Sequence, residues 1–132
     1  MNYRIIEGAG QIPVSEAERL LKTTYWAGNR SGGTIEKSMR NSACYGIWSD
    51  EEQKLIGFAR VITDYVTTWY LCDVIIDEAY RHQGLGKELV SHIASEFAGL
   101  RGLLLTRDAH GLYGKYGFET VEGRAMSRPP QR

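Results

Sequence analysis

Residues 77–90 combine basic side chains and glycines in a pattern that can bind an anion. An apolar segment ends there, a glycine-rich turn follows, and an amphipathic segment begins directly after the turn. The first N–H groups of a helix have no partner within the helix, and the helix dipole adds partial positive charge there. Gly84 and Gly86 let the main chain approach a ligand closely, and Arg81 and Lys87 add formal positive charge. The turn is therefore predicted to hold a phosphate-bearing ligand.

Three phosphate-loop patterns can be tested against the spacing of this turn. A Walker loop requires Ser or Thr after its Gly-Lys pair, whereas Gly86-Lys87 is followed by Glu88. A dinucleotide fingerprint requires a third glycine, and Leu89 stands at that place. The third pattern, Gln/Arg-x-x-Gly-x-Gly/Ala, is matched by residues 81–86.

A second motif follows at residues 112–118, with the sequence Leu-Tyr-Gly-Lys-Tyr-Gly-Phe. In this order and at this interval, the two motifs resemble the signatures of the GCN5-related N-acetyltransferase family (GNAT). The resemblance covers residues 47–118, and residues 106–110 are similar to an uncharacterised bacterial branch of the family. It implies an enzyme that moves an acetyl group from acetyl-CoA to a primary amine, by direct transfer in a ternary complex.

The order of the predicted elements agrees with the fold that this resemblance implies. That fold is α+β: a mixed, mostly antiparallel sheet, flanked by helices in a sandwich-like arrangement, which splays open near its middle. Residues 1–126 are expected to form a single domain, and residues 127–132 a short polar C-terminal tail. Strands are predicted at residues 3–7, 43–48, 55–62, 69–76, 103–105 and 118–121, and helices at residues 15–23, 34–40, 87–97 and 108–116.

In this family the cofactor lies along the splay and over the glycine-rich turn. Carried onto this chain, the resemblance implies that the pantetheine arm of acetyl-CoA pairs with the backbone of Val74, Ile75 and Ile76. Thr106 stands where many members carry an Asn that contacts the cofactor. The turn residues expected to bind the cofactor are Arg81, His82, Gln83, Gly84, Leu85, Gly86 and Lys87.

Acetyl transfer to an amine needs a base, an oxyanion donor and an acid, because an ammonium does not attack and the sulfur leaves better as a thiol. Tyr113 occupies the family's tyrosine position and is the candidate acid. Asp73 interrupts an apolar strand, which is consistent either with a base in a cleft or with a structural carboxylate. His110 and a chain of water molecules are the other candidate bases. The N–H of Val74 is the expected oxyanion donor.

Tyr25 and Trp26 fall where the family usually builds its acceptor pocket, and they either stack on a substrate or pack in the core. The acceptor is not specified by the sequence, although small size and zero formal net charge favour a small-molecule amine over a protein amine. A domain that senses acyl-CoA without turning it over is the competing function. Tyr113 argues against it, because a sensor needs no acid.

The composition of the chain limits which partners it can bind and indicates where it is located. The formal net charge of zero provides no basic surface for nucleic acid, and no apolar run is long enough to span a membrane. Cys44 and Cys72 are interpreted as buried free thiols, which favours a cytoplasmic location. His82 and His92 lack metal-ligand spacing, so no metal site is predicted. Homodimers are common in the family that the motifs resemble.

Overall fold

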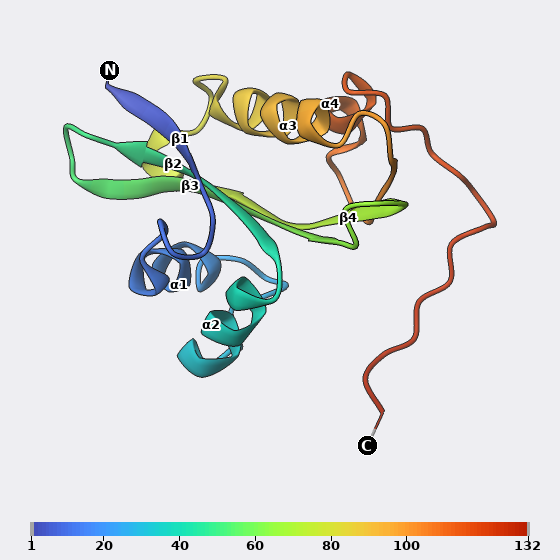
Figure 1. The fold of residues 1–132 in the computed structure, drawn as a ribbon, viewed down its shortest axis with the longest axis horizontal. Coiled ribbons are helices and arrows are strands. Elements are labelled where there is room, and N and C mark those ends of the chain that lie inside the picture. The colour runs from blue at the N-terminus through green and yellow to red at the C-terminus, as the bar shows by residue number, and fades with distance from the viewer. Residues whose placement is uncertain (1, 132) are drawn as a thin grey trace.

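A sheet with helices on both faces forms the body of the computed structural model, which describes residues 2–131 (Figure 1). Neighbouring strands are antiparallel except for the last pair, which is parallel, and this confirms the predicted mixed sheet. The strands, in their order across the sheet, are β1 (Tyr3–Glu7), β2 (Ala43–Ser49), β3 (Lys54–Thr63), β4 (Thr68–Ile76) and β5 (Arg101–Leu104). The helices are α1 (Val14–Leu21), α2 (Gly32–Arg40), α3 (Leu85–Glu96) and α4 (His110–Gly114).

Apolar side chains on both faces of the sheet hold the helices in place. Helices α1 and α2 cover one face and α3 and α4 the other (Figure 1). In α3, apolar residues recur every three or four positions, so they share the side that faces the sheet. The cluster under α1 and α2 includes Leu20, Leu21, Ile35, Met39, Phe58 and Ile75, and the cluster under α3 includes Ile56, Val61, Leu71, Leu85, Leu89 and Ile93.

A β-bulge in β4 creates the splay between β4 and β5. The register with β3 shifts at Cys72, so Leu71 packs under α3 whereas Asp73 and Ile75 turn to the face of α1. A bulge bends its strand and increases its twist. The parallel pairing of β4 with β5 accordingly ends at Leu71 and Leu104. Among the described residues no strand lies beside residues 72–76 on that side, and we call this stretch the open edge of β4.

The first two helices begin earlier than predicted. Helix α1 begins at Val14, directly after Pro13 and one residue before the predicted start at Ser15. Helix α2 begins at Gly32, since Ser31 accepts the N–H of Thr34 at 3.1 Å and so caps the helix. The predicted start at residue 34 places Gly32 and Gly33 outside this helix, whereas the structure includes both.

The strand predicted at residues 118–121 is wrong, since the structure has no strand there. Gly117 turns the chain with a φ of 89°, and the ring of Phe118 packs edge-on against Trp69 at a centroid distance of 5.4 Å. A strand needs a neighbour to complete its hydrogen bonds, and this segment meets none. Beyond residue 121 the chain leads away from the sheet (Figure 1). Residues 127–131 of the predicted tail are exposed, and residue 132 lies outside the described residues.

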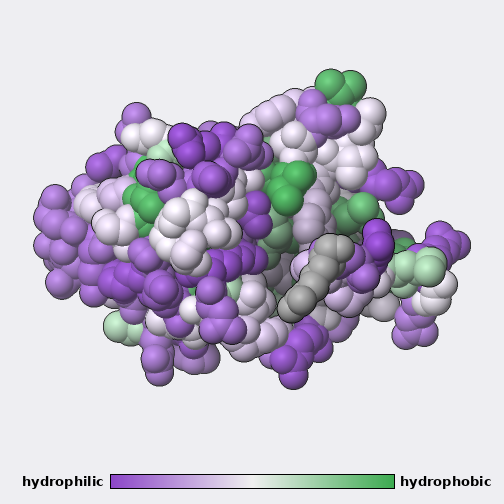
Figure 2. Space-filling model, turned by 90° about the horizontal axis from the view of Figure 1, so that it is seen from below, coloured by the Kyte–Doolittle hydropathy of each residue, from purple (hydrophilic) through white to green (hydrophobic). Residues whose placement is uncertain are grey.

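The surface over α1 and α2 is mostly hydrophilic, with small and separate apolar areas (Figure 2). No helix within residues 2–131 is long and apolar enough to cross a membrane. Cys44 is buried and Cys72 half-buried, and both are free thiols as predicted.

Candidate functional site

The turn between β4 and α3 presents a run of free backbone donors. The N–H groups of residues 82–87 have no protein acceptor anywhere in the described part of the chain. Gly84 precedes α3 with a φ of 83°, and a Cβ there would project into open space. Residues 81–84 are exposed. Backbone donors that converge at a helix start form a binding site for an anion. We call residues 81–87 the basic turn.

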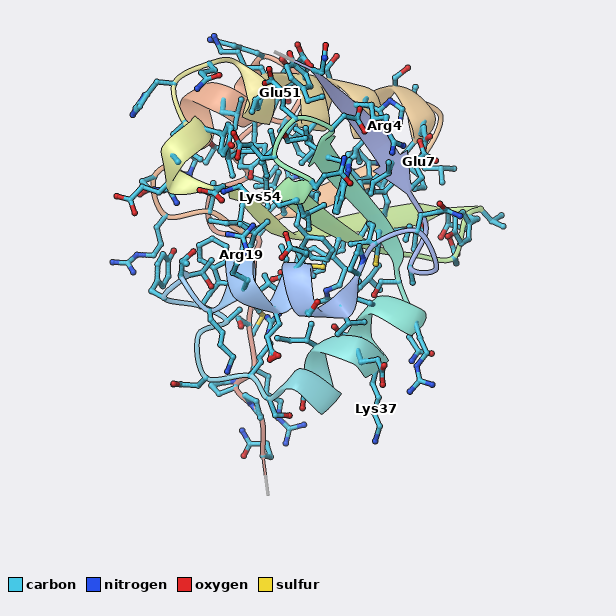
Figure 3. The ribbon with its side chains drawn as sticks, turned by 90° about the vertical axis from the view of Figure 1, so that its left-hand side faces the viewer. Arg4, Glu7, Arg19, Lys37, Glu51 and Lys54 are labelled. Atoms are coloured by element: carbon cyan, nitrogen blue, oxygen red, sulfur yellow. The ribbon has the colours of Figure 1, made fainter. Side chains whose placement is uncertain are left out.

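The base of the basic turn is anchored to α1 and to the sheet. Asp77 donates its N–H to the carbonyl of Ile56 at 2.8 Å and accepts the N–H of Ala79 at 3.0 Å. Arg19 of α1 donates to the Asp77 carboxylate at 3.0 Å, and Lys54 lies near the same group. Arg19 and Lys54 are labelled in Figure 3. Burial opposes ionisation of Asp77, but these hydrogen bonds outweigh it and lower its pKa. The turn is therefore held in place by contacts that leave its outer face free.

The open edge of β4 leads directly into the basic turn. Val74 and Ile76 pair with β3 on one side, while the backbone groups that point the other way meet no strand among residues 2–131. The Nε of Arg81 donates to the carbonyl of Ile76 at 3.1 Å, so the turn folds back on the end of the strand. An extended ligand could follow this edge and reach the free N–H groups of the turn.

Asp73 lies on the open edge, where its carboxylate is surrounded by donors. Its side chain is only 1% exposed. Trp26 Nε1 donates to one carboxylate oxygen at 3.0 Å, and Arg30 and Arg60 each donate to the other at 2.8 Å. Burial opposes ionisation, but the hydrogen bonds and charges of the two arginines outweigh it and lower the pKa of Asp73. This geometry favours the structural interpretation of Asp73 over a role as base, and we call the four residues the Asp73 network.

Tyr25 and Trp26 lie near the open edge and not in the core. The two rings meet edge to face at a centroid distance of 5.1 Å and are 68% and 41% exposed. The guanidinium of Arg107, which follows β5, lies 4.7 Å from the centre of the Tyr25 ring. The connection between α1 and α2 therefore contacts both sides of the splay: β4 through Trp26 and the segment after β5 through Tyr25.

Helix α4 carries the two remaining candidates for proton transfer. Tyr113 is half-buried and packs against Phe118 at a ring-centroid distance of 6.0 Å. Burial, with a smaller contribution from Asp108, raises the pKa of the Tyr113 phenol. His110 is exposed at the first position of the same helix. Thr106 accepts the N–H of Ala109 at 3.0 Å, which leaves its hydroxyl proton free for another acceptor.

Sequence reasoning missed the two arginines that bind Asp73. Arg60 did leave a signal, because a lone cation in the apolar strand at residues 55–62 needs a partner. Arg30 left none, since it stands in a polar, glycine-rich loop. Its position beside Asp73 depends on how the connection after α1 folds back onto the sheet.

Comparisons with known proteins agree with this geometry. A family profile described as "Acetyltransferase (GNAT) domain" matches residues 40–120. The crystal structure of an acetyltransferase assigned to the GNAT family, from Xanthomonas campestris pv. campestris, is similar with a TM-score of 0.88 and 30% identity, covering 98% of this chain and 94% of that one.

Two curated relatives are similar over part of their length. An uncharacterised N-acetyltransferase from Prochlorococcus marinus is 37% identical over 85 residues, which are 62% of this chain and 47% of that protein. A histone acetyltransferase from Glycine max is 32% identical over 81 residues, 61% of this chain and 32% of that protein. The chain thus spans about half the length of the first relative and about a third of the second.

Proposed function

Because this chain belongs to the GNAT family of acetyltransferases, we propose that it transfers an acetyl group from acetyl-CoA to a primary amine of a small molecule. The observation that carries this proposal is the continuity between the open edge of β4 and the free N–H groups of residues 82–87. Coenzyme A has an extended arm with amide groups and a pyrophosphate at its far end. The arm suits the edge of a strand, and the pyrophosphate suits a helix start.

In the proposed arrangement, the pantetheine arm forms hydrogen bonds with the backbone of Val74, Ile75 and Ile76. The basic turn binds the pyrophosphate. Gly84 leaves room for the ligand, while Arg81 and Lys87 add charge to a site built mainly from backbone N–H groups. Thr106 is proposed to contact the cofactor through its free hydroxyl proton.

The proposed reaction is a direct attack on the thioester. The neutral amine forms a C–N bond with the acetyl carbonyl, whose oxygen accepts the N–H of Val74 in the tetrahedral intermediate. The C–S bond then breaks, and the sulfur takes a proton from Tyr113 to leave as a thiol. The raised pKa of Tyr113 supports this assignment, because it keeps the phenol protonated at neutral pH.

The proton of the amine must go to a base, and the geometry argues against Asp73 in that role. Three donors already occupy the Asp73 carboxylate, and its lowered pKa makes it a weak base. We assign the role to His110, one helical turn before Tyr113, or to water that connects the site with solvent. Asp73 is instead proposed to hold Trp26 and Arg30 in position.

The acceptor is proposed to enter beside Tyr25 and Trp26. Their exposed rings border the open edge and can stack on a small amine. The Glycine max relative, which is named a histone acetyltransferase, supports a protein amine as a second candidate. A peptide acceptor would need a longer exposed groove. The compact pair of Tyr25 and Trp26 therefore suits a small amine better than a peptide.

Calorimetric titration of the protein with acetyl-CoA tests the cofactor assignment. We expect saturable binding of acetyl-CoA, with dephospho-CoA and NAD as controls. NAD carries a pyrophosphate but no pantetheine arm, so it should not bind. Equal affinity for NAD and acetyl-CoA would contradict the assignment of the β4 edge.

A screen of amines, with detection of the released thiol, then tests turnover. Release of free thiol that depends on a small amine would support the proposed reaction. Release only with peptide amines would favour the second candidate, and binding of acetyl-CoA without turnover of any amine would favour a sensor.

A further inference from the structure

A histidine and two glutamates from distant parts of the chain meet on the side of α3 that faces β1. His92 and Glu96 are four residues apart on α3, and Glu7 is the last residue of β1 (Figure 3). His92 Nε2 contacts Glu7 Oε1 and lies 3.3 Å from Glu96 Oε1. The three ligand-type atoms lie within 4.8 Å of one another. We call these three residues the His92 cluster.

The two carboxylates lie close together, and no lysine or arginine among the described residues forms an ion pair with either. Both carboxylates lie against the same imidazole nitrogen, so they repel each other. Glu96 also ends α3, where the negative end of the helix dipole disfavours a carboxylate. A bound cation would relieve both repulsions at once.

A buried phenol holds one of the ligands from behind. Tyr45 of β2 is 3% exposed, and its hydroxyl donates to Glu96 Oε2 at 2.6 Å. That bond leaves the other oxygen of Glu96, Oε1, facing His92. Metal-binding side chains are commonly oriented by such outer hydrogen bonds. The cluster therefore has a supporting contact as well as three ligands.

From this geometry we propose that the His92 cluster binds a divalent ion of the zinc type. The imidazole nitrogen favours zinc over magnesium or calcium, which prefer oxygen ligands alone. Zinc holds nitrogen and oxygen ligands at about 2.0–2.2 Å, so the half-exposed carboxylates need only small rotations to close around it. A water molecule completes the four ligands. The bound ion ties β1 to α3, away from the proposed acetyl-transfer chemistry.

Titration of the metal-stripped full chain with zinc chloride tests this proposal, with cobalt chloride as a spectroscopic probe. We expect one zinc ion per chain and a melting temperature that rises with zinc concentration. The cobalt spectrum should lack the intense thiolate bands that binding to Cys44 or Cys72 would give. Absence of saturable binding, or a thiolate spectrum, would overturn the proposal.

Three variants locate the ion. His92→Gln and Glu7→Gln should each weaken zinc binding by more than about tenfold and abolish the rise in melting temperature. Glu88→Gln is the matched control, because Glu88 lies one turn before His92 on α3 and bonds Tyr3 instead. Unchanged affinity in both cluster variants, or an equal loss in the control, would overturn the proposal. Circular dichroism of each variant establishes that it is folded.

Discussion

The basic turn and the Asp73 network lie at opposite ends of the open edge of β4 and are built in opposite ways. The turn offers backbone N–H groups at residues 82–87 that meet no acceptor among the described residues, and Arg81, His82, Gln83 and Lys87 are exposed. The network is made of side chains that satisfy one another around a carboxylate that is 1% exposed. The first region is open to a ligand, and the second region holds a loop in place.

This difference decides which mutations should matter in each region. A backbone site tolerates the loss of individual side chains and fails when its main chain is blocked or bent. A side-chain network fails when a central member is replaced, because its partners are left buried and unpaired. The following predictions use this contrast, from the largest expected effect to the smallest.

Gly84→Glu should abolish detectable binding of acetyl-CoA. The new side chain would project into the space in front of the turn, add negative charge next to a pyrophosphate, and strain a backbone with a φ of 83°. Calorimetry measures the loss. Gly84→Asn is the control for strain, since Asn tolerates this conformation without adding charge. Undiminished affinity in Gly84→Glu would contradict the assignment of the turn.

Tyr113→Phe should lower kcat by about 100-fold and leave the Kd for acetyl-CoA unchanged, if the phenol is the acid. The change removes one hydroxyl and keeps the ring that packs against Phe118. Stopped-flow detection of the released thiol measures the chemical step. Tyr116→Phe, in the neighbouring turn, is the matched control. An unchanged chemical step would remove Tyr113 from the mechanism.

Asp73→Asn should raise the KM for the acceptor on the order of tenfold, equivalent to about 1.4 kcal/mol of binding, while the Kd for acetyl-CoA changes little. The amide cannot balance the charges of Arg30 and Arg60, so the loop that carries Trp26 loosens. Stability should fall by about 3 kcal/mol, as when one partner of a buried ion pair is lost. A loss of kcat with an unchanged acceptor KM would instead restore Asp73 as a candidate base.

The effect of Asp73→Asn on stability should depend on pH. The folded-state pKa of Asp73 lies below its ordinary value of 3.8, so its contribution is complete above that value and is lost as the pH falls through the folded-state pKa. Urea denaturation of both proteins at neutral pH and below about pH 4 measures this difference. A difference that does not change with pH would show that the charge of Asp73 is not what stabilises the fold.

Lys87→Ala should weaken acetyl-CoA binding by only about threefold, because an exposed charge contributes little beside a row of backbone donors. The loss should diminish as salt is added. Titrations at two salt concentrations measure it. A loss as large as that in Gly84→Glu would mean that side-chain charge, and not the backbone, dominates the site.

Much of the region proposed to bind the cofactor could be predicted as a turn and a helix from the sequence, because its structure is local. The glycines, the basic residues and the start of the helix that follows all lie between residues 81 and 87, so local geometry brings them together. The same holds for Tyr113 and Phe118. The failed prediction at residues 118–121 concerns a strand, whose formation depends on a distant neighbour.

The region proposed to bind the acceptor could be predicted only in part, because its contacts join residues far apart in the chain. Trp26 and Asp73 were both identified, but their hydrogen bond depends on the bulge at Cys72, which turns Asp73 toward α1. Periodicity alone would place Asp73 on the same face as Leu71. The bulge also ends the pairing of β4 with β5, so the site opens at the same point.

The sequence by itself therefore determined the family, the mixed sheet and the basic turn, since each depends on residue types at short and regular intervals. The tertiary structure alone decided that Asp73 is held by Arg30 and Arg60, and that Glu7 meets His92 and Glu96. Glu7 and His92 are 85 positions apart. Only the packing of α3 against β1 brings their side chains together, and no motif spacing along the chain predicts that contact.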